Sequence, residues 1–437
     1  MPDSARSRVR WILIGWIFLV GAVSYLDRVN LGIAGKWVMA DFHLDKVQLG
    51  LIQSAFVLGY ALFQVPAGWL ADRIGPRRIL ALGVIWWGIF TCLITVVPLV
   101  GWVLLILISI RFGLGAGEAV VYPASNKIVA AWIPSDERGL ANGFIFTGVG
   151  FGAGVTPPLI AFIVVNYGWR ASFWCSALIG VAVGAVWYLL ARDTPREHPW
   201  VSTHEHALIE AGLPPVTPGS NDGRLAWREI FGDRDLVLVT LSYFTYGYAA
   251  FIFFSWFFIY LNDVRGLDLR HSALWSMLPF LAMAGGSSGG GWLSDIITRR
   301  SGKRAGRCWL AAVGIGLAAV FIAAGTLAAS TPTAVIVLAA GAGALYISQS
   351  SFWSVSADIG KKSAGSVSGL MNMGAQMGSV FSGSLTPFIG KYLGWNMSFL
   401  VAAVLCAGGA VAWFFVSANY GESRERGPIR QTIESLS

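Results

Sequence analysis

Apolar runs of about 20 residues or more recur along the whole chain, separated by short polar turns. The hydrocarbon core of a bilayer is about 30 Å thick, and a helix needs about 20 apolar residues to cross it. Only 12% of the 437 residues are charged, about half the share found in soluble domains. The sequence therefore predicts an all-α membrane protein with twelve transmembrane helices. The expected spans are about 11–34, 47–71, 78–98, 101–132, 137–165, 170–192, 235–262, 269–297, 306–329, 332–358, 362–391 and 394–418.

The first apolar run could be mistaken for a secretory signal, because Arg6, Arg8 and Arg10 precede it. It is too long for the apolar core of a signal peptide and lacks a small-x-small cleavage site. It also carries Asp27 and Arg28. We therefore interpret it as the first spanning helix.

Lysine and arginine gather on one side of the predicted membrane. The amino terminus and every second connection hold the dense clusters: Arg73, Arg77, Arg78, Arg138, Arg192, Arg196, Arg224, Arg228, Arg234, Arg299, Arg300, Lys303, Arg304, Arg307, Lys361, Lys362, Arg424, Arg426 and Arg430. The other connections hold six: Lys36, Lys46, Arg170, Arg265, Arg270 and Lys391. Basic residues mark the cytoplasmic side, so both termini are expected in the cytoplasm. The net charge of +8 follows from this asymmetry, and its expected partner is the lipid bilayer, not nucleic acid.

Three landmarks repeat at a nearly constant spacing, which indicates a six-plus-six duplication. They are Gly68-Trp69-Leu70-Ala71-Asp72 with Gly291-Trp292-Leu293-Ser294-Asp295, Asn142-Gly143 with Ser368-Gly369, and Gly168-Trp169-Arg170-Ala171-Ser172-Phe173 with Gly394-Trp395-Asn396-Met397-Ser398-Phe399. An even number of helices per half gives both halves the same orientation. Transporters built from such parallel repeats bind substrate near the bilayer midplane, between the halves.

The duplication divides the chain into four parts. We expect two six-helix bundles at residues 1–192 and 235–420, and a cytoplasmic tail at 421–437. Residues 193–234 are rich in proline and polar residues, so they are expected to form a flexible cytoplasmic linker. Within it, Leu225 to Asp233 is patterned like a short amphipathic surface helix.

Arg111 and Glu118 lie seven residues apart inside one apolar run. Seven residues rotate a helix by about 700°, close to two full turns, so both side chains project from one face roughly 10 Å apart along the axis. A charge near the bilayer centre costs roughly 2.5 to 3.5 kcal/mol on insertion scales, so both groups need partners or water. A transport pathway through the membrane supplies both.

Several motifs now support a resemblance to a known family. The run Gly68-x-x-x-Asp72-Arg73-x-Gly75-x-Arg77-Arg78 resembles the loop signature of the major facilitator superfamily, with Pro76 where arginine or histidine is frequent. The second copy keeps Gly291, Asp295, Arg299 and Arg300 with altered spacing. Three further runs look like the anion:cation symporter branch, which includes galactonate, glucarate, hexuronate and phthalate carriers and sialin: Tyr25-Leu26-Asp27-Arg28-Val29-Asn30, Arg111 to Glu118 with Tyr122-Pro123, and Glu137-Arg138-Gly139-x-Ala141.

The resemblance implies a proton-coupled importer of small organic anions that works by alternating access in a bacterial inner membrane. By position, Arg28 and Arg111 match substrate-contacting arginines, and Asp27 and Glu118 match proton-titrated carboxylates. Further positions match substrate contacts of that branch: Tyr60, Ser350, Trp353 and Asn372.

The chemistry of these residue types agrees. A guanidinium offers a planar fork to a carboxylate and stays charged in a protein, and a carboxyl group in the lumen is able to bind and release a proton.

Other roles for the same residues stay open. Arg28 lies roughly 9 Å from the outer end of its helix and could extend to the interface. Arg111 could form a static salt bridge with Glu118 or Asp27, and Asp27 could merely orient Arg28. The glycines of 143–154 and 365–378 are typical of close helix contact.

Four residues are candidates for gating: Asp72, Arg73, Arg77 and Asp295. A carboxylate at the cytoplasmic end of a helix can cap the amino terminus of the next helix and hold the two halves together. The alternative is a topology signal without a gating function.

The sequence predicts no metal site, no cofactor and no enzyme activity. Cys92, Cys175, Cys308 and Cys406 lie in different apolar runs without CxxC spacing, and no pair of nucleophile and base stands out. We expect a monomer that imports a carboxylate, with a sugar acid favoured. An organophosphate/phosphate exchanger and a non-transporting anion sensor are the alternatives.

Overall fold

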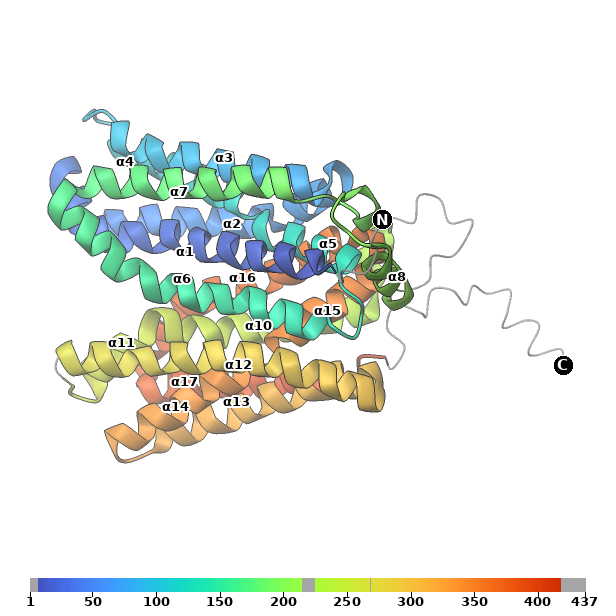
Figure 1. The fold of residues 1–437 in the computed structure, drawn as a ribbon. Coiled ribbons are helices and arrows are strands. Elements are labelled where there is room, and N and C mark those ends of the chain that lie inside the picture. The colour runs from blue at the N-terminus through green and yellow to red at the C-terminus, as the bar shows by residue number, and fades with distance from the viewer. Residues whose placement is uncertain (1–6, 214–224, 268, 418–437) are drawn as a thin grey trace.

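The structure, a computed structural model, describes residues 7–213, 225–267 and 269–417. Within these ranges the chain forms two stacked helical bodies (Figure 1). The first body contains α1 (Val9–Phe42), α2 (Lys46–Ile74), α3 (Pro76–Leu93), α4 (Val103–Glu118), α5 (Val121–Trp132), α6 (Arg138–Tyr167) and α7 (Trp169–Leu190).

The second body is built in the same way. It contains α10 (Arg234–Phe251), α11 (Phe257–Ile259), α12 (Leu269–Lys303), α13 (Leu310–Leu327), α14 (Thr331–Ile347), α15 (Gln349–Gly360), α16 (Ala364–Leu393) and α17 (Trp395–Phe414). Two π-helical segments, Ile252–Trp256 and Tyr260–Val264, continue α10 and α11. A third, Arg304–Trp309, leads into α13.

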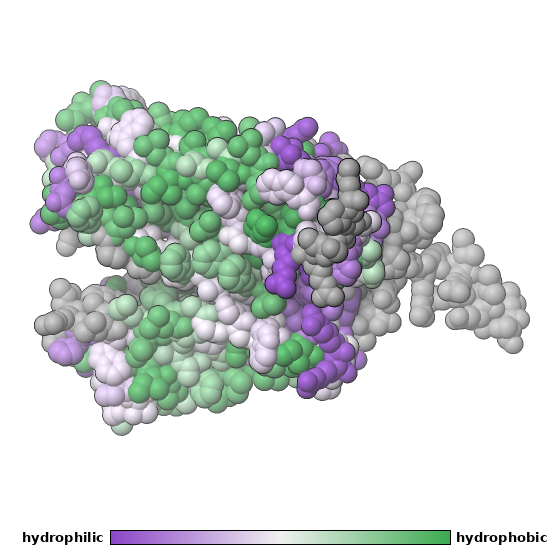
Figure 2. All heavy atoms as spheres, viewed as in Figure 1, coloured by the Kyte–Doolittle hydropathy of each residue, from purple (hydrophilic) through white to green (hydrophobic). Residues whose placement is uncertain are grey.

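The described helices account for the twelve expected spans. Among the described residues, nine stretches are long and apolar enough to cross a membrane, and two of them, Trp275–Leu327 and Thr331–Leu393, each contain two crossings. The thirty-residue helix α6 completes the set. Lipid-facing positions expose large apolar side chains, such as Leu82, Ile85 and Ile89 on α3. Hydrophobic side chains gather in the middle of the molecule and hydrophilic ones at its two ends (Figure 2).

Two spans are divided near their middle. The fourth span is interrupted between Glu118, the last residue of α4, and Val121, the first residue of α5. The tenth span is interrupted at Ser348, between α14 and α15. The two breaks occupy equivalent positions of the two bodies, and discontinuous helices are typical of midplane binding sites in transporters.

The two bodies meet through α2 with α16 and through α6 with α12. Both crossings are close enough that only glycine fits. A Cβ added to Gly68 would lie 2.1 Å from the carbonyl oxygen of Gly365, and one added to Gly291 would lie 2.3 Å from that of Gly139. Gly143 and Gly369 make close contacts of the same kind, with the backbone of Ser287 and of Gln64 in the opposite body. The two bodies are therefore packed tightly where α2 crosses α16 and where α6 crosses α12.

The connection between the bodies is more ordered than expected. A flexible linker was expected over residues 193–234, but the described part holds a short 3₁₀ turn (Pro195–Glu197), α8 (Thr203–Gly212) and α9 (Trp227–Gly232). The expected surface helix at Leu225 to Asp233 is confirmed by α9. Residues 214–224, which carry Pro214, Pro215, Pro218 and Arg224, lie outside the described residues, as do Arg6 and the tail at 418–437.

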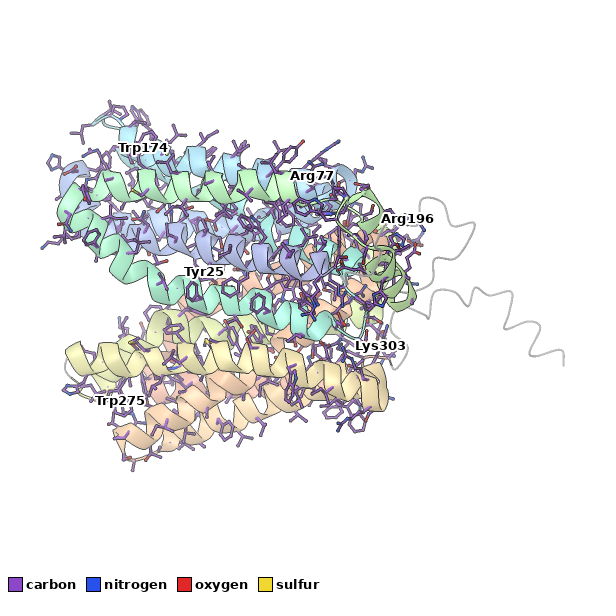
Figure 3. All side chains as sticks on the ribbon, viewed as in Figure 1. Tyr25, Arg77, Trp174, Arg196, Trp275 and Lys303 are labelled. Atoms are coloured by element: carbon purple, nitrogen blue, oxygen red, sulfur yellow. The ribbon has the colours of Figure 1, made fainter. Side chains whose placement is uncertain are left out.

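The end that carries α8 also carries the basic clusters, so it is the cytoplasmic end. Arg77, Arg196 and Lys303 lie at this end, while Trp174 and Trp275 lie at the opposite one (Figure 3). At the opposite end the space-filling view shows a hollow between the bodies (Figure 2). The structure is therefore outward-facing.

Candidate anion-binding cavity

A cavity of about 470 Å³ lies between the two bodies. Its size falls within the usual range for small-molecule sites, about 300 to 1,000 Å³. Tyr25, on α1, is one of the lining residues and lies on the side of the first body that faces the second (Figure 3). The polar lining residues are Tyr25, Arg28, Gln53, Tyr60, Arg111, Tyr122, Tyr243, Tyr246, Ser255, Tyr346, Gln349, Asn372, Gln376 and Ser379.

Two arginines of the first body share one aromatic ring. The guanidinium carbon of Arg111 lies 4.9 Å from the ring centre of Phe56, and that of Arg28 lies 5.4 Å from the same ring. Arg28 also lies over Tyr60, at 4.3 Å, and Tyr25, at 5.0 Å. Cation–π contacts of this kind stabilise a desolvated guanidinium by about 2 kcal/mol. Phe56 therefore sets the spacing of the two positive charges at the cavity wall.

The carboxylates differ in their contacts. Glu118 is fully buried, and its Oε2 accepts a hydrogen bond from Nε of Arg28 at 2.7 Å. Asp27 is 1% exposed, and neither of its oxygens has a hydrogen-bond partner among the described residues. Neither carboxylate belongs to the cavity lining. Both lie behind the arginines, where they offset the positive charge without blocking the cavity.

Arg111 keeps unused donors. Its Nε and Nη1 atoms are buried and have no hydrogen-bond partner in the described part of the chain. A buried polar donor without a partner costs about 1 to 3 kcal/mol, and more when it is charged. Arg111 thus makes no static salt bridge with Glu118 in this state. Arg28 does not extend to the interface either, because its guanidinium lies over the aromatic rings of the cavity wall.

The wall contributed by the second body is polar but uncharged. No described lining residue of α10 to α16 carries a charge. Tyr243 accepts hydrogen bonds from Nε2 of Gln349 and from Nε1 of Trp353, both at 2.9 Å. Asn372 donates from Nδ2 to Oε1 of Gln64 at 2.9 Å, across the two bodies. All charge at the site therefore comes from the first body.

The expected substrate contacts divide into two groups. Arg28, Arg111, Tyr60 and Asn372 line the cavity. Ser350 and Trp353 do not belong to the lining, because both are buried. Trp353 donates to Tyr243, and its ring packs at a tilt against those of Tyr122 and Phe146.

For most of the aromatic stretch Tyr243 to Tyr260 the sequence favours packing or an interface belt, with a minority touching substrate, and Tyr243 and Tyr246 line the cavity. Tyr25, Tyr122 and Tyr346, which are not among the expected contacts, also line it. Their signal was tyrosine in place of phenylalanine within apolar spans.

On the cytoplasmic side of the cavity, two aspartates form hydrogen bonds between the bodies. Each of them binds the amino terminus of a helix in the other body. Asp72 accepts from the backbone N–H groups of Gly365 and Ser366, at 3.1 and 2.7 Å, at the start of α16. Asp295 accepts from the N–H groups of Gly139 and Leu140, at 2.9 and 2.6 Å, at the start of α6. We call these two contacts the cytoplasmic caps. Each Asp caps a helix of the opposite body, not the next helix of its own.

Cations accompany both caps. Lys127 lies 3.0 Å from Asp72, and Arg307 lies 2.7 Å from Asp295. Arg73 and Arg77, by contrast, contact their own body: Arg73 lies over Trp69, and Arg77 donates to the carbonyl oxygen of Tyr188.

Further polar contacts close the same end. Arg138 pairs with Asp358, and Nδ2 of Asn126 donates to Oγ of Ser356 at 3.0 Å. Each pair joins the first body to the second. The outward-facing cavity is thus separated from the cytoplasm by hydrogen bonds and ion pairs between the bodies at the cytoplasmic end.

Together these features define a class of protein: a membrane carrier of two six-helix bundles with a central cavity, positively charged on one wall. The model of the Major Facilitator Superfamily matches residues 17–370 and 301–436. The chain belongs to this superfamily, and it is a transporter and not an enzyme.

Curated relatives are named for anions. The chain is 32% identical to the probable sulfoacetate transporter SauU of Cupriavidus necator, over 94% of this chain and 95% of the relative. It is 29% identical to the hexuronate transporter of Bacillus subtilis (92% and 93%) and 28% identical to the probable L-galactonate transporter of Escherichia coli (92% and 87%). The protein is an anion transporter of the Major Facilitator Superfamily.

Solved structures share the fold. The E. coli fucose:proton symporter FucP matches with a TM-score of 0.70 at 17% identity, covering 94% of this chain and all of that one. The proton:xylose symporter XylE matches with a TM-score of 0.73 at 15% identity, covering 94% and 97%.

Proposed function

We propose that this transporter imports a small carboxylate, a sugar acid above all, together with protons across the cytoplasmic membrane of a bacterium. It works as a monomer by alternating access between outward- and inward-facing states. The relatives named for hexuronate, galactonate and sulfoacetate support an organic anion. The cavity of about 470 Å³ has room for a sugar acid.

The observation that carries this proposal is the pair of arginines on Phe56. Arg111 holds two buried donor atoms without a partner, and Arg28 holds one, Nη2. A carboxylate placed between them receives charge-assisted hydrogen bonds from two planar forks. Tyr60 and Asn372 are the proposed neighbours on either side. Ser350 and Trp353 remain proposed contacts, which become accessible only if α15 rearranges.

Glu118 and Asp27 are the proposed proton sites. Glu118 bonds to Arg28 rather than to Arg111, so an anion arriving at Arg28 competes with the carboxylate for one guanidinium. Protonation of Glu118 removes that competition and lets anion and proton occupy the site together. Asp27 is buried, and neither of its oxygens has a hydrogen-bond partner among the described residues, so it is the second proposed proton site.

The test is transport by purified protein in vesicles, with hexuronate, galactonate, glucarate and sulfoacetate as probes. Wild type should accumulate at least one probe when the outside is more acidic. Glu118→Gln should lose this accumulation and still exchange labelled for unlabelled probe, because the amide oxygen can accept the hydrogen bond from Arg28. Gradient-driven accumulation in the variant would move proton coupling to Asp27.

Two other functions appear as outcomes of the same experiment. With phosphate added as a fifth probe in the same vesicles, an organophosphate/phosphate exchanger would exchange labelled for unlabelled phosphate, would ignore the pH gradient and would be unaffected by Glu118→Gln. A sensor would bind a probe and transport none.

A further inference from the structure

The linker helix α8 supplies a buried carboxylate to the start of the first span. Glu205 is 1% exposed, and a buried charge is costly unless it is hydrogen-bonded. Its Oε2 accepts from the hydroxyl of Ser7 at 2.6 Å and from N–H of Val9 at 3.0 Å. Its Oε1 accepts from N–H of Arg10 at 3.2 Å. Val9 and Arg10 are the first two residues of α1, whose N-cap Arg8 provides no side-chain cap.

Glu205 therefore does for α1 what Asp72 does for α16 and Asp295 does for α6. In each case a carboxylate from another element satisfies the free N–H groups of a first helical turn. The cap on α1 differs in that its carboxylate comes from the linker.

The far end of α8 contacts the loop between α5 and α6. The carbonyl oxygen of Gly212 accepts from N–H of Ser135 at 3.0 Å. A Cβ at Gly212 would lie 2.5 Å from Cβ of Pro134, and Ile209 is fully buried. The helix is thus held at both ends against the first body.

This same loop, residues 133–137, is where the first body meets the second. The carbonyl oxygen of Ser135 accepts from Nη2 of Arg307 at 2.8 Å, and Asp136 pairs with Arg299 at 3.0 Å. Ser135 thus donates its N–H to the linker and accepts with its C=O from the second body. Arg307 is also the cation beside Asp295.

A second chain of contacts runs in parallel. Arg10 lies 3.5 Å from Glu205 and 3.2 Å from Glu137, and Glu137 lies 3.8 Å from Arg299 of α12. Both chains lead from α8 through the loop 133–137 to the cytoplasmic end of the second body.

We propose that α8 is a strut of the first body, and that Glu205 is a positioning residue that holds the loop 133–137 in the shape required for closure against Arg299 and Arg307. Loss of the strut leaves the cavity residues in place and weakens the cytoplasmic closure. The outward-facing state then loses population to the inward-facing one.

Cysteine labelling tests this without any transported anion. In a background with the four native cysteines replaced, Ser354→Cys reports cytoplasmic opening, because Ser354 is fully buried and contacts Asn142 of the first body. Ser255→Cys, at an exposed position of the cavity lining, reports the outer side. In Glu205→Ala, the labelling rate at 354 should rise at least threefold and the rate at 255 should fall. Glu205→Gln, which keeps one acceptor oxygen for a backbone N–H, should show a smaller shift.

The matched control is Glu210→Ala on the same helix, since Glu210 is exposed and pairs with Arg196 of the linker itself. It should label like the unmodified background. A loss of native packing without a change of state would raise labelling at both reporters, so the opposite changes at 354 and 255 distinguish positioning from a merely structural role.

A second variant keeps the proposal testable if Glu205→Ala fails to fold. Arg10→Gln leaves the backbone N–H groups capped and removes only the ion pairs to Glu205 and Glu137. It should raise labelling at 354, whereas Arg8→Gln, at an exposed neighbour, should not. Unchanged rates at both reporters in Glu205→Gln and Arg10→Gln would overturn the proposal. Because no substrate is used, that failure is distinct from a failure of the proposed anion uptake.

Discussion

The ring of Phe56 contacts two guanidinium groups at once, those of Arg28 and Arg111. Its ring lies 4.9 Å from Arg111 and 5.4 Å from Arg28. A planar guanidinium can stack on the ring and still direct its N–H groups into the cavity, whereas an ammonium is a compact point charge. Shape as well as charge therefore matters at residue 111.

We expect Arg111→Lys to bind substrate almost as poorly as Arg111→Gln. A hydrogen bond to a charged group contributes about 1.5 to 3 kcal/mol, so affinity should fall by roughly 10- to 100-fold. Equilibrium binding in detergent measures this, with the best substrate of the vesicle assay. Arg170→Lys, at a half-exposed surface ion pair with Asp41, is the control and should bind normally. Wild-type affinity in Arg111→Lys would remove Arg111 from the site.

The site could be predicted from sequence only in part. Arg28 and Arg111 could be predicted because a charged residue inside an apolar run is costly in a membrane and therefore indicates a functional site. Ser350 was expected to line the cavity, but its neighbour Gln349 does so. Adjacent helical residues point about 100° apart, so residues 349 and 350 do not face the cavity together in this state, and Ser350 is buried instead.

At the scale of the elements, helix amino termini connect the two bodies. Asp72 and Asp295 each accept two backbone N–H groups from a helix of the opposite body. A carboxylate is also favoured there by the helix dipole. Because the caps bridge the bodies only at the cytoplasmic end, they stabilise the outward-facing state.

Asp72→Asn should therefore shift the protein towards the inward-facing state. The amide keeps one acceptor and loses the charge, at a cost of about 1 to 2 kcal/mol, which corresponds to a shift of about 5- to 30-fold in the ratio of states. Labelling of Ser354→Cys should rise accordingly while binding affinity changes little. Arg170→Gln, the control, removes a half-exposed charge that pairs with Asp41 at the opposite end of the first body, and it should leave labelling unchanged. Normal labelling combined with poor or inverted membrane insertion would instead identify Asp72 as a topology signal.

Gly68→Ala should shift the states further than Asp72→Asn. A methyl group 2.1 Å from the carbonyl oxygen of Gly365 cannot be accommodated by a side-chain movement, so α2 and α16 must separate. The same Ser354→Cys assay measures the effect. Gly15→Ala in α1, where a Cβ meets no atom within 4 Å, is the matched control. Labelling equal to that of the control would mean that the crossing tolerates a methyl group.

Most spans could be predicted because the bilayer requires long apolar helices. The cytoplasmic caps could not be predicted in detail, because the partner of Asp72 starts at Gly365, nearly three hundred residues away, and nothing local identifies it. The order of the linker was missed for a similar reason. Its prolines and polar residues favour flexibility, while the contact that orders α8 comes from the start of α1.

At the scale of the whole molecule, the outward-facing cavity and the cytoplasmic closure lie on opposite ends of one interface. Asn126 and Ser356 occupy similar places in the two bodies, on α5 and α15, and they contact each other across it. Alternating access requires such a contact to break in each cycle. Proximity of these two residues should therefore hold only in the outward-facing state.

A disulfide between Asn126→Cys and Ser356→Cys should stop transport without stopping binding. The side-chain atoms of the two residues lie 3.0 Å apart, within reach of a disulfide after a small adjustment. The oxidised double variant should bind substrate from the outer side with an affinity within about threefold of the reduced form, because the bond holds the state that already has the open cavity. Uptake into vesicles should fall to background and return when a reductant is added. Each single variant, treated with the same oxidant, should transport normally. Full uptake by the cross-linked protein would show that α5 and α15 stay together throughout the cycle, and the substrate would then have to leave by a route that does not separate the two bodies at this contact.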